Sequence, residues 1–267
     1  MTHHVAIAAR GRYVRHSATL LGSLAPQTAG LDLQVHYLHA GLSRRARRRL
    51  ERAAGAAIAF HEVPEERVAG LPVQGYFTSA MWYRLLLDEL VEAERVLYLD
   101  VDTLAVDALG PLWATDLSGA YLAAVTNVFQ PDHLFHAAEL GIAPERYFNS
   151  GVLLLHLAAI REDGCMDRVR QVAAERADLR GWPDQDALNL VLGERRVALH
   201  PRWNAMNALW RPEAEQVFGA AAVAEARRAP AIRHFEGPAD NKPWARASRP
   251  PGAELWRAQR RQIRPKF

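Results

Sequence analysis

The chain is poor in cysteine and in lysine: among its 267 residues it has one cysteine, Cys165, and two lysines, Lys242 and Lys266. A single cysteine excludes an intramolecular disulfide and any zinc site made of several thiolates. No apolar run approaches the roughly 20 residues that span a bilayer. The N-terminal segment reaches Arg10 and Arg12 too early to form the apolar core of a secretory signal. These absences lead us to expect a cytoplasmic protein.

Charge is nearly balanced, with 33 basic and 30 acidic residues and a formal net charge of +3. Almost every cation is an arginine, and the arginines are scattered among acids rather than interleaved with aromatic residues. This distribution argues against a nucleic-acid partner. The composition, 49% hydrophobic and 24% charged, is that of a globular protein. With no internal repeat and no strong linker, we expect one domain over residues 1–245 and a basic, aromatic tail over 246–267.

Short apolar runs alternate with amphipathic stretches along the chain. The pattern predicts strands at 5–9, 31–38, 58–60, 96–99, 121–125 and 151–156. It predicts helices at 13–24, 44–54, 157–178 and 184–192, and another that opens at Thr78 and Ser79 and continues to Leu90. Ser43 is expected to cap the helix at 44–54. Strands that alternate with helices of this length favour an α/β fold with a mainly parallel sheet.

The segment Val96-Leu-Tyr-Leu-Asp-Val-Asp-Thr-Leu104 combines a short apolar run with two carboxylates, Asp100 and Asp102. The run is typical of a buried strand, and residues just past the carboxyl end of such a strand lie where open α/β sheets bind ligands. Two carboxylates this close repel each other unless a cation lies between them. Mg²⁺ and Mn²⁺ prefer such oxygen ligands, together with substrate phosphates. The segment therefore predicts a metal–phosphate site, with two solvated loop carboxylates as the alternative.

Further polar segments follow in a recognisable order. They are Tyr147-Phe-Asn-Ser-Gly-Val-Leu-Leu-Leu155, Pro183-Asp-Gln-Asp-Ala-Leu-Asn189, His234-Phe-Glu-Gly237 and Lys242-Pro-Trp244. Together with the Asp-x-Asp segment they resemble glycosyltransferase family 8, the retaining nucleotide-sugar transferases, and within it the bacterial lipopolysaccharide galactosyl- and glucosyltransferases. The likeness covers residues 5–245. It implies a glycosyltransferase A-type fold, which is a single Rossmann-like nucleotide-binding domain with a mainly parallel, mixed sheet.

The resemblance also implies a metal site and a donor site. Asp100 and Asp102 match the family's Asp-x-Asp and His234 matches its third metal ligand, so we expect Mn²⁺, or Mg²⁺, together with a UDP-hexose donor. The residues expected to contact metal, nucleotide or sugar are Ala8, Ala9, Tyr13, Arg84, Asp100, Val101, Asp102, Asn149, Ser150, Asp184, Gln185, His234, Gly237 and Lys242. Those expected to act in catalysis are Arg84, Asp184, Gln185 and Lys242.

The expected catalytic roles follow from chemistry at the matched positions. Gly237 and Lys242 match a loop over the diphosphate, where glycine lets the backbone approach phosphate and an ammonium neutralises the leaving group. Asp184 and Gln185 match the pair beneath the donor sugar, and either would be the nucleophile of a double displacement. A front-face attack, in which the leaving phosphate accepts the acceptor's proton, needs neither and is preferred. Without the resemblance, Asp184 would be interpreted as a helix N-cap and Lys242 as a surface lysine.

Two positions depart from the family pattern. Arg10 stands where close relatives carry an aspartate that binds uracil, and a guanidinium cannot accept the uracil N3–H because it only donates. Tyr13 is still expected to stack on the base. Residues 238–241 make the loop before Lys242 longer than in close relatives. We nevertheless expect transfer of galactose or glucose from UDP to a hydroxyl of a saccharide or glycolipid acceptor, as in lipopolysaccharide biosynthesis.

Two alternative functions stay open. A haloacid-dehalogenase-like phosphatase also has an apolar strand followed by Asp-x-Asp-x-Thr, with Asp100 as the phosphorylated nucleophile and Asp102 as the general acid. Against it, that motif normally opens the domain, and here it lies far along the chain. The second alternative is a catalytically silent nucleotide-sugar-binding module, which Arg10 and the longer 238–241 loop would explain.

The tail over 246–267 combines arginines with Trp256 and Phe267. Basic residues with interspersed aromatic residues suit an anionic membrane surface. We therefore expect peripheral contact with the inner face of a membrane and a lipid-linked acceptor, with a solvated C-terminal arm as the alternative.

Overall fold

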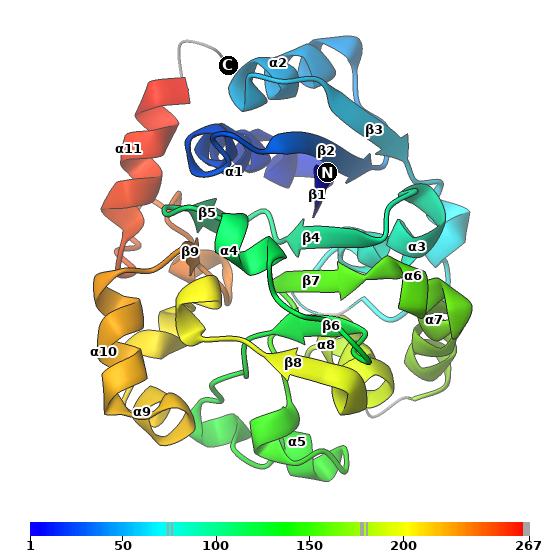
Figure 1. Cartoon of the computed structure of the whole chain (residues 1–267), viewed down its shortest axis with the longest axis vertical. Coiled ribbons are helices and arrows are strands. Elements are labelled where there is room, and N and C mark those ends of the chain that lie inside the picture. The colour runs from blue at the N-terminus through cyan, green and yellow to red at the C-terminus, as the bar shows by residue number, and fades with distance from the viewer. Residues whose placement is uncertain (74, 76, 177–178, 180, 264–267) are drawn as a thin grey trace.

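The computed structural model describes residues 1–73, 75, 77–176, 179 and 181–263. Within these residues, a seven-stranded sheet runs through the middle of the molecule (Figure 1). Its strands are β1 (Thr2–Ala8), β2 (Asp32–His39), β3 (Ile58–Glu62), β4 (Arg95–Leu99), β6 (Leu122–Ala124), β7 (Val152–His156) and β8 (Arg196–Ala198). A separate two-stranded sheet pairs β5 (Thr103–Ala105) with β9 (Ile232–His234).

The order of strands in the large sheet is β3-β2-β1-β4-β7-β6-β8. β1 is parallel to both β2 and β4, β2 is parallel to β3, and β7 runs antiparallel to both of its neighbours. The sheet is therefore mixed and mainly parallel, which confirms the predicted fold class. Because β1 and β4 are adjacent and parallel, the loops that follow Ala8 and Leu99 leave the same edge of the sheet.

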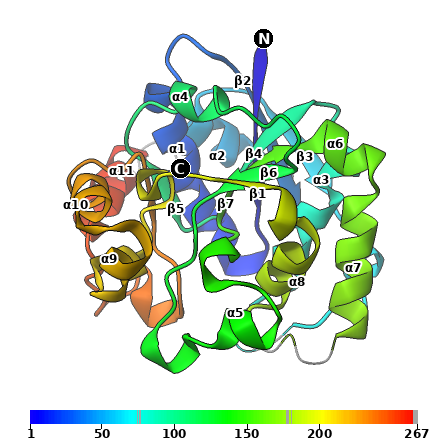
Figure 2. The same cartoon turned by 60° about the horizontal axis from the view of Figure 1, so that its bottom comes forward.

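Helices cover both faces of the sheet. They are α1 (Val14–Gln27), α2 (Arg44–Ala54), α3 (Leu87–Leu90), α4 (Gly110–Trp113), α5 (His136–Glu139), α6 (Leu157–Glu162), α7 (Cys165–Glu175), α8 (Pro183–Leu192), α9 (Glu213–Phe218), α10 (Ala220–Arg228) and α11 (Ala253–Ile263). On β4, Leu97 and Leu99 face the core that α1 and α2 cover. Val96 and Tyr98 alternate with them and face the core that α6, α7 and α8 cover. Figure 2 shows the sheet between α1 and α7.

The local sequence patterns predicted where helices lie better than they predicted where each helix begins and ends. Ser43 caps α2, because its Oγ accepts a hydrogen bond from the backbone N–H of Ala46 at 3.2 Å. The single helix predicted at 157–178 is wrong: Gly164, at a φ of +59°, separates α6 from α7. Its last residues, 177–178, lie outside the described residues.

The segment expected to form a helix from Thr78 and Ser79 adopts a 3₁₀ helix over Ser79–Leu86, and α3 continues it. The short strands β5 and β8 were not predicted. Three residues each are too few for an alternating pattern to stand out, and both strands depend on partners distant in the chain.

Part of the C-terminal tail is built into the domain. Helix α11 packs on α1, where a Cβ added at Gly22 would lie 2.5 Å from Cγ2 of Ile263. Trp256 is buried, with its ring 5.5 Å from that of Trp244. The indole expected at a membrane surface therefore belongs to the core, and Phe267 lies outside the described residues. The structure gives the predicted membrane contact no support, and the division at residue 245 stays a prediction. Along the described chain, no helix combines the length and the hydropathy that crossing a bilayer requires.

Candidate functional site

The loops that follow β1 and β4 border a cavity of about 560 Å³. Its wall includes every residue that the sequence predicted to contact metal, nucleotide or sugar, from Ala8 to Lys242. It also includes residues that the sequence did not single out, among them Asn127, Phe129, Trp182, Arg211 and Glu236. The volume suits a small-molecule ligand. The placement agrees with the predictions, whereas the role of each residue stays a prediction.

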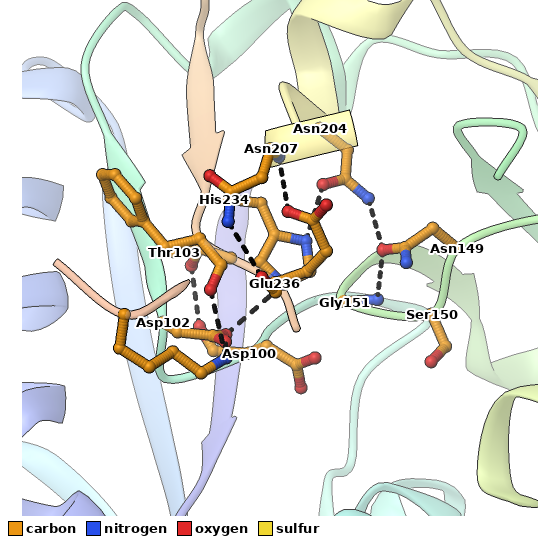
Figure 3. Close-up of polar contacts among 12 residues, drawn as sticks. Asp100, Asp102, Thr103, Asn149, Ser150, Gly151, Asn204, Asn207, His234 and Glu236 are labelled. Atoms are coloured by element: carbon orange, nitrogen blue, oxygen red, sulfur yellow. Dashed lines mark hydrogen bonds and ion pairs between the residues drawn. The ribbon is translucent and has the colours of Figure 1, made fainter. Parts of the chain in front are cut away.

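Two carboxylates and an imidazole converge on one wall of the cavity. Strand β9 pairs antiparallel with β5 so that His234 lies opposite Thr103, directly after Asp102. One possible ligand atom from each of Asp100, Asp102 and His234 lies within 4.8 Å of the other two (Figure 3). Carboxylate oxygens with an imidazole nitrogen form a donor set that fits Mn²⁺ or Mg²⁺. These residues therefore fit the predicted divalent metal.

The imidazole of His234 is held in one orientation. Its Nδ1 lies 2.9 Å from Oδ1 of Asn204, an oxygen that only accepts, so Nδ1 donates there. Nε2 is then the nitrogen that faces Oδ1 of Asp102, at 3.3 Å. Gly151 gives the ring its room, because a Cβ at that position would lie 2.2 Å from Cε1 of His234. Asn204 was missed by the sequence analysis, since it belongs to no recognised motif.

Lys242 is buried against the carboxylate of Asp102. Its ammonium donates to Oδ2 of Asp102 and to the carbonyl oxygen of Phe235, the latter at 3.0 Å. Burial opposes ionisation of Asp102, but Lys242 and His234 outweigh it and hold the pKa of that carboxyl below its usual range. Lys242 thus reaches the candidate metal site, even though the sequence analysis expected a longer loop before it. Its contact with a diphosphate stays a prediction.

Arg84 pairs with the carboxylates of Asp100 and Asp184. Its Nη2 lies 2.9 Å from Oδ1 of Asp100 and 3.4 Å from Oδ2 of Asp184, and its Nη1 donates to the carbonyl oxygen of Ser150 at 2.6 Å. The hydroxyl of Tyr98 also donates to Oδ1 of Asp100, at 2.9 Å. Burial, which Arg84 offsets only in part, raises the pKa of Asp184 to about 6. Arg84 therefore orients Asp100 and compensates buried negative charge.

Both polar atoms of the Gln185 amide have hydrogen-bond partners within the protein. Its Oε1 accepts hydrogen bonds from Nδ2 of Asn149 at 3.1 Å and from the backbone N–H of Ser150 at 2.9 Å. Its Nε2 donates to the hydroxyl of Tyr147 at 3.2 Å. Both lone pairs of the amide oxygen are therefore directed at donors from the protein itself.

Arg10 and loop 238–241, which the sequence analysis expected to depart from the family pattern, also border the cavity. Arg10 donates to the hydroxyl of Ser79 and lies 2.6 Å from Oε1 of Glu65. Its guanidinium is thus paired within the protein while it lines the cavity. Tyr13, expected to stack on a base, lies nearby with its ring 6.1 Å from that of Trp244 in an edge-on arrangement. Loop 238–241 packs on Gly237, whose added Cβ would lie 2.7 Å from Nδ2 of Asn241.

Comparison with known proteins places this geometry in a family. The sequence model of glycosyl transferase family 8 matches residues 4–248. The structure is similar to that of the galactosyltransferase LgtC in complex with donor and acceptor sugar analogs, with a TM-score of 0.85, 27% identity, and coverage of 99% of this chain and 100% of that one. The chain therefore belongs to glycosyl transferase family 8, and the resemblance and the fold expected from its motifs are confirmed.

Curated relatives agree at the level of the family. The chain is 28% identical over 253 residues to General stress protein A of Bacillus subtilis, which covers 90% of this chain and 87% of that protein. It is 27% identical over 154 residues to a lipopolysaccharide 1,2-glucosyltransferase of Escherichia coli, which covers 56% of this chain and 45% of that enzyme. The chain is a glycosyltransferase on this basis, and a haloacid-dehalogenase-like phosphatase is not favoured.

Proposed function

We propose that this chain is a metal-dependent, retaining hexosyltransferase. It would move galactose or glucose from UDP to a hydroxyl of a saccharide or lipid-linked acceptor. The observation that carries the proposal is the convergence of Asp100, Asp102 and His234 on the wall of one cavity. The family match supports the class of reaction, and the structure of LgtC in complex with donor and acceptor sugar analogs supports a site for two sugars.

Asp100, Asp102 and His234 would hold Mn²⁺ or Mg²⁺. When bound, the metal supplies positive charge that stabilises a departing diphosphate. The chain's own cations prepare the ligands: Arg84 orients Asp100, and Lys242 keeps Asp102 ionised. Both cations are buried, so their charges act through a medium of lower dielectric constant than water.

The contacts of Gln185 support a front-face mechanism. An amide oxygen is a weak nucleophile, and that of Gln185 already accepts two hydrogen bonds. Asp184 is chemically the better nucleophile, but its carboxylate pairs with the buried Arg84. In a front-face attack, the acceptor's proton goes to the leaving phosphate oxygen, and these residues bind and orient the sugar instead. Retention of the anomeric configuration is part of the proposal and is implied by the family.

The base of the donor is proposed to be uracil, although Arg10 cannot accept its N3–H. The pairing of Arg10 with Glu65 and Ser79 leaves this recognition to other groups, such as the backbone carbonyls that follow β1. Thermal unfolding with Mn²⁺ and each nucleoside diphosphate tests the base directly. Stabilisation by UDP above the others supports the proposal, whereas preference for a purine diphosphate contradicts it.

Release of UDP tests the reaction. The purified chain is incubated with Mn²⁺ and UDP-galactose or UDP-glucose, and UDP is measured with and without a chelator. We expect metal-dependent release that Asp102→Asn abolishes. Asp116→Asn is the matched control, because Asp116 is exposed and bonds only with Ser118 in the described contacts. Nucleotide binding without release would favour a silent binding module, and phosphate release from a phosphomonoester would favour a phosphatase.

A further inference from the structure

A series of hydrogen bonds runs in one direction from the wall of the cavity into the interior behind it. Each member donates to the next: Nδ1 of His234 to Oδ1 of Asn204 (2.9 Å), Nδ2 of Asn204 to Oδ1 of Asn149 (2.8 Å), Nδ2 of Asn149 to Oε1 of Gln185 (3.1 Å), Nε2 of Gln185 to the hydroxyl of Tyr147 (3.2 Å), and that hydroxyl to Oδ1 of Asp186. Figure 3 shows the part from His234 to Asn149.

The backbone fixes the direction of this series. The N–H of Gly151 donates to Oδ1 of Asn149 at 3.1 Å, and the N–H of Ser150 donates to Oε1 of Gln185 at 2.9 Å. A backbone N–H cannot accept, so the oxygen and nitrogen of both amides are assigned by their partners. The terminal acceptor must then be able to accept from Tyr147, and a carboxylate does so more strongly than a neutral group.

This series of hydrogen bonds ends at a buried carboxylate that is paired with a histidine. Asp186 is fully buried, and its Oδ1 accepts from Tyr147 and lies 2.7 Å from Nε2 of His136. Among the described contacts its Oδ2 has no partner. Burial, reinforced by Asp186, raises the pKa of Tyr147 well above its ordinary value, so this hydroxyl keeps its proton and donates. His136 is therefore the group that compensates the carboxylate.

His136 begins α5 and is enclosed by the elements around it. A Cβ added at Gly181 would lie 3.1 Å from its Cε1, so the neighbouring backbone touches the ring. The charged groups that face it are Asp186 from α8 and Glu139 from its own helix. The hydrogen bond with Asp186 raises the pKa of His136 against the opposing effect of burial. Its other neighbours are the rings of Phe129, Tyr147 and Trp182.

We propose that His136 is a positioning residue for Gln185: its pairing with Asp186 keeps that carboxylate the terminal acceptor of the series and so holds the Gln185 amide in one orientation. Without His136, Asp186 would keep a single described partner, Tyr147, and its buried charge would be uncompensated. Its side chain would then no longer be held as the acceptor for Tyr147. The orientation of Gln185 would lose its anchor. His136, Tyr147 and Asp186 lie behind the wall of the cavity rather than in it.

Nuclear magnetic resonance tests the coupling without any substrate. The protein is labelled with ¹⁵N-glutamine. The side-chain amide signal of Gln185 is assigned by its loss in the variant Gln185→Glu. Between pH 5.5 and 8.5 we expect this signal to shift with the same midpoint as the ring of His136. In His136→Gln, which keeps a donor but cannot titrate, the signal should no longer depend on pH. In Tyr147→Phe, His136 should still titrate while Gln185 no longer follows.

Either of two results would overturn the proposal. One is a Gln185 signal that stays fixed while His136 titrates in the wild type. The other is a signal that follows His136 equally well in Tyr147→Phe. Should Tyr147→Phe not fold, the comparison of the wild type with His136→Gln decides the matter. If the Gln185 signal depends on pH in the same way in the wild type and in His136→Gln, His136 and Gln185 are not coupled.

Kinetics provides a second readout, which rests on the proposed function. We expect His136→Phe to lower kcat at least tenfold and to leave KM for the donor within twofold, because in the proposed function Gln185 lies beneath the transferring sugar and not against the nucleotide. His136→Gln should restore kcat to within threefold of the wild type. His156→Phe is the matched control, since His156 also lies near a carboxylate, Glu94, at 3.9 Å, but away from the cavity. An unchanged kcat in His136→Phe refutes the positioning role. Absence of turnover in the wild type refutes the proposed function alone.

Discussion

The amide of Asn204 allows a test of the metal site that leaves all three candidate ligands in place. Asn204 is 1% exposed, and its Oδ1 lies 2.9 Å from Nδ1 of His234. The substitution Asn204→Ala removes that acceptor, so the imidazole can turn or move its proton to the other nitrogen. Loss of such an outer partner costs about 10–100-fold in metal affinity. We expect a weakening of this size for Mn²⁺.

The same substitution has a predictable cost in stability. The Nδ1–H of His234 becomes a buried donor with no acceptor, which costs about 1–3 kcal/mol. Asn149 also loses the hydrogen bond from Asn204 but still accepts from the N–H of Gly151. In a chain of this size, 1 kcal/mol corresponds to about 2–4 °C in Tm. We therefore expect Tm to fall by roughly 2–12 °C.

Electron paramagnetic resonance of free Mn²⁺ measures the affinity, with and without UDP. Asn189→Ala is the matched control: Asn189 is also buried and makes three hydrogen bonds, to Phe148 and Gln185, but none to a candidate metal ligand. It should lose stability and keep its Mn²⁺ affinity. If Asn204→Ala binds Mn²⁺ within twofold of the wild type, the reasoning about the orientation of His234 is refuted.

Three further perturbations test the site. Gly151→Ala should abolish Mn²⁺ binding measured in the same way, because its Cβ would displace the ring of His234, 2.2 Å away; unaltered affinity would contradict this. Lys242→Met should lower the free energy of unfolding in urea by about 3–5 kcal/mol, since it leaves Asp102 buried without its ammonium; a loss below 1 kcal/mol would show that the pair contributes little. Burial raises the pKa of Asp184 to about 6. Between about pH 4 and 6 this carboxyl therefore binds more protons in the folded than in the unfolded state. Its contribution to the stability of the fold is lost as pH rises through this range. The free energy of unfolding in urea should therefore rise for Asp184→Asn relative to the wild type by up to ~3 kcal/mol between pH 4 and pH 7. If variant and wild type differ in this free energy by the same amount at both pH values, the raised pKa is excluded.

The sequence predicted those parts of the fold and site that depend on local patterns. The run before Asp100 is a buried strand because its apolar residues face cores on both sides of the sheet. The Asp-x-Asp segment lies at the carboxyl end of that strand, where a ligand site was expected. In both cases the signal lies within ten consecutive residues of sequence.

The remaining parts depend on residues that meet only after folding. His234 reaches Asp102 because β9 pairs with β5, and neither strand's partner can be inferred from its own three residues. Its assignment as a ligand came from the family resemblance alone. The hydrogen bonds of Asn204 and of Asp186 join segments far apart in the chain, and an isolated Asn or Asp has no pattern that marks it as buried. Such partners follow from the tertiary structure and not from periodicity.

The arrangement of charge explains why metal and diphosphate should depend on each other. With His234 neutral, as a metal ligand must be, the carboxylates of Asp100, Asp102 and Asp184 face the two cations Arg84 and Lys242. Among these five side chains one negative charge remains uncompensated, and Glu236 adds another close to His234 and Lys242. This excess next to the candidate ligands favours a cation and disfavours a diphosphate there. A bound divalent ion would reverse this sign and favour the diphosphate. Because linkage is reciprocal, UDP should strengthen Mn²⁺ binding by the same factor by which Mn²⁺ strengthens UDP binding. The two titrations with and without the second ligand should therefore close one thermodynamic cycle, and equal Mn²⁺ affinities with and without UDP would contradict a shared site.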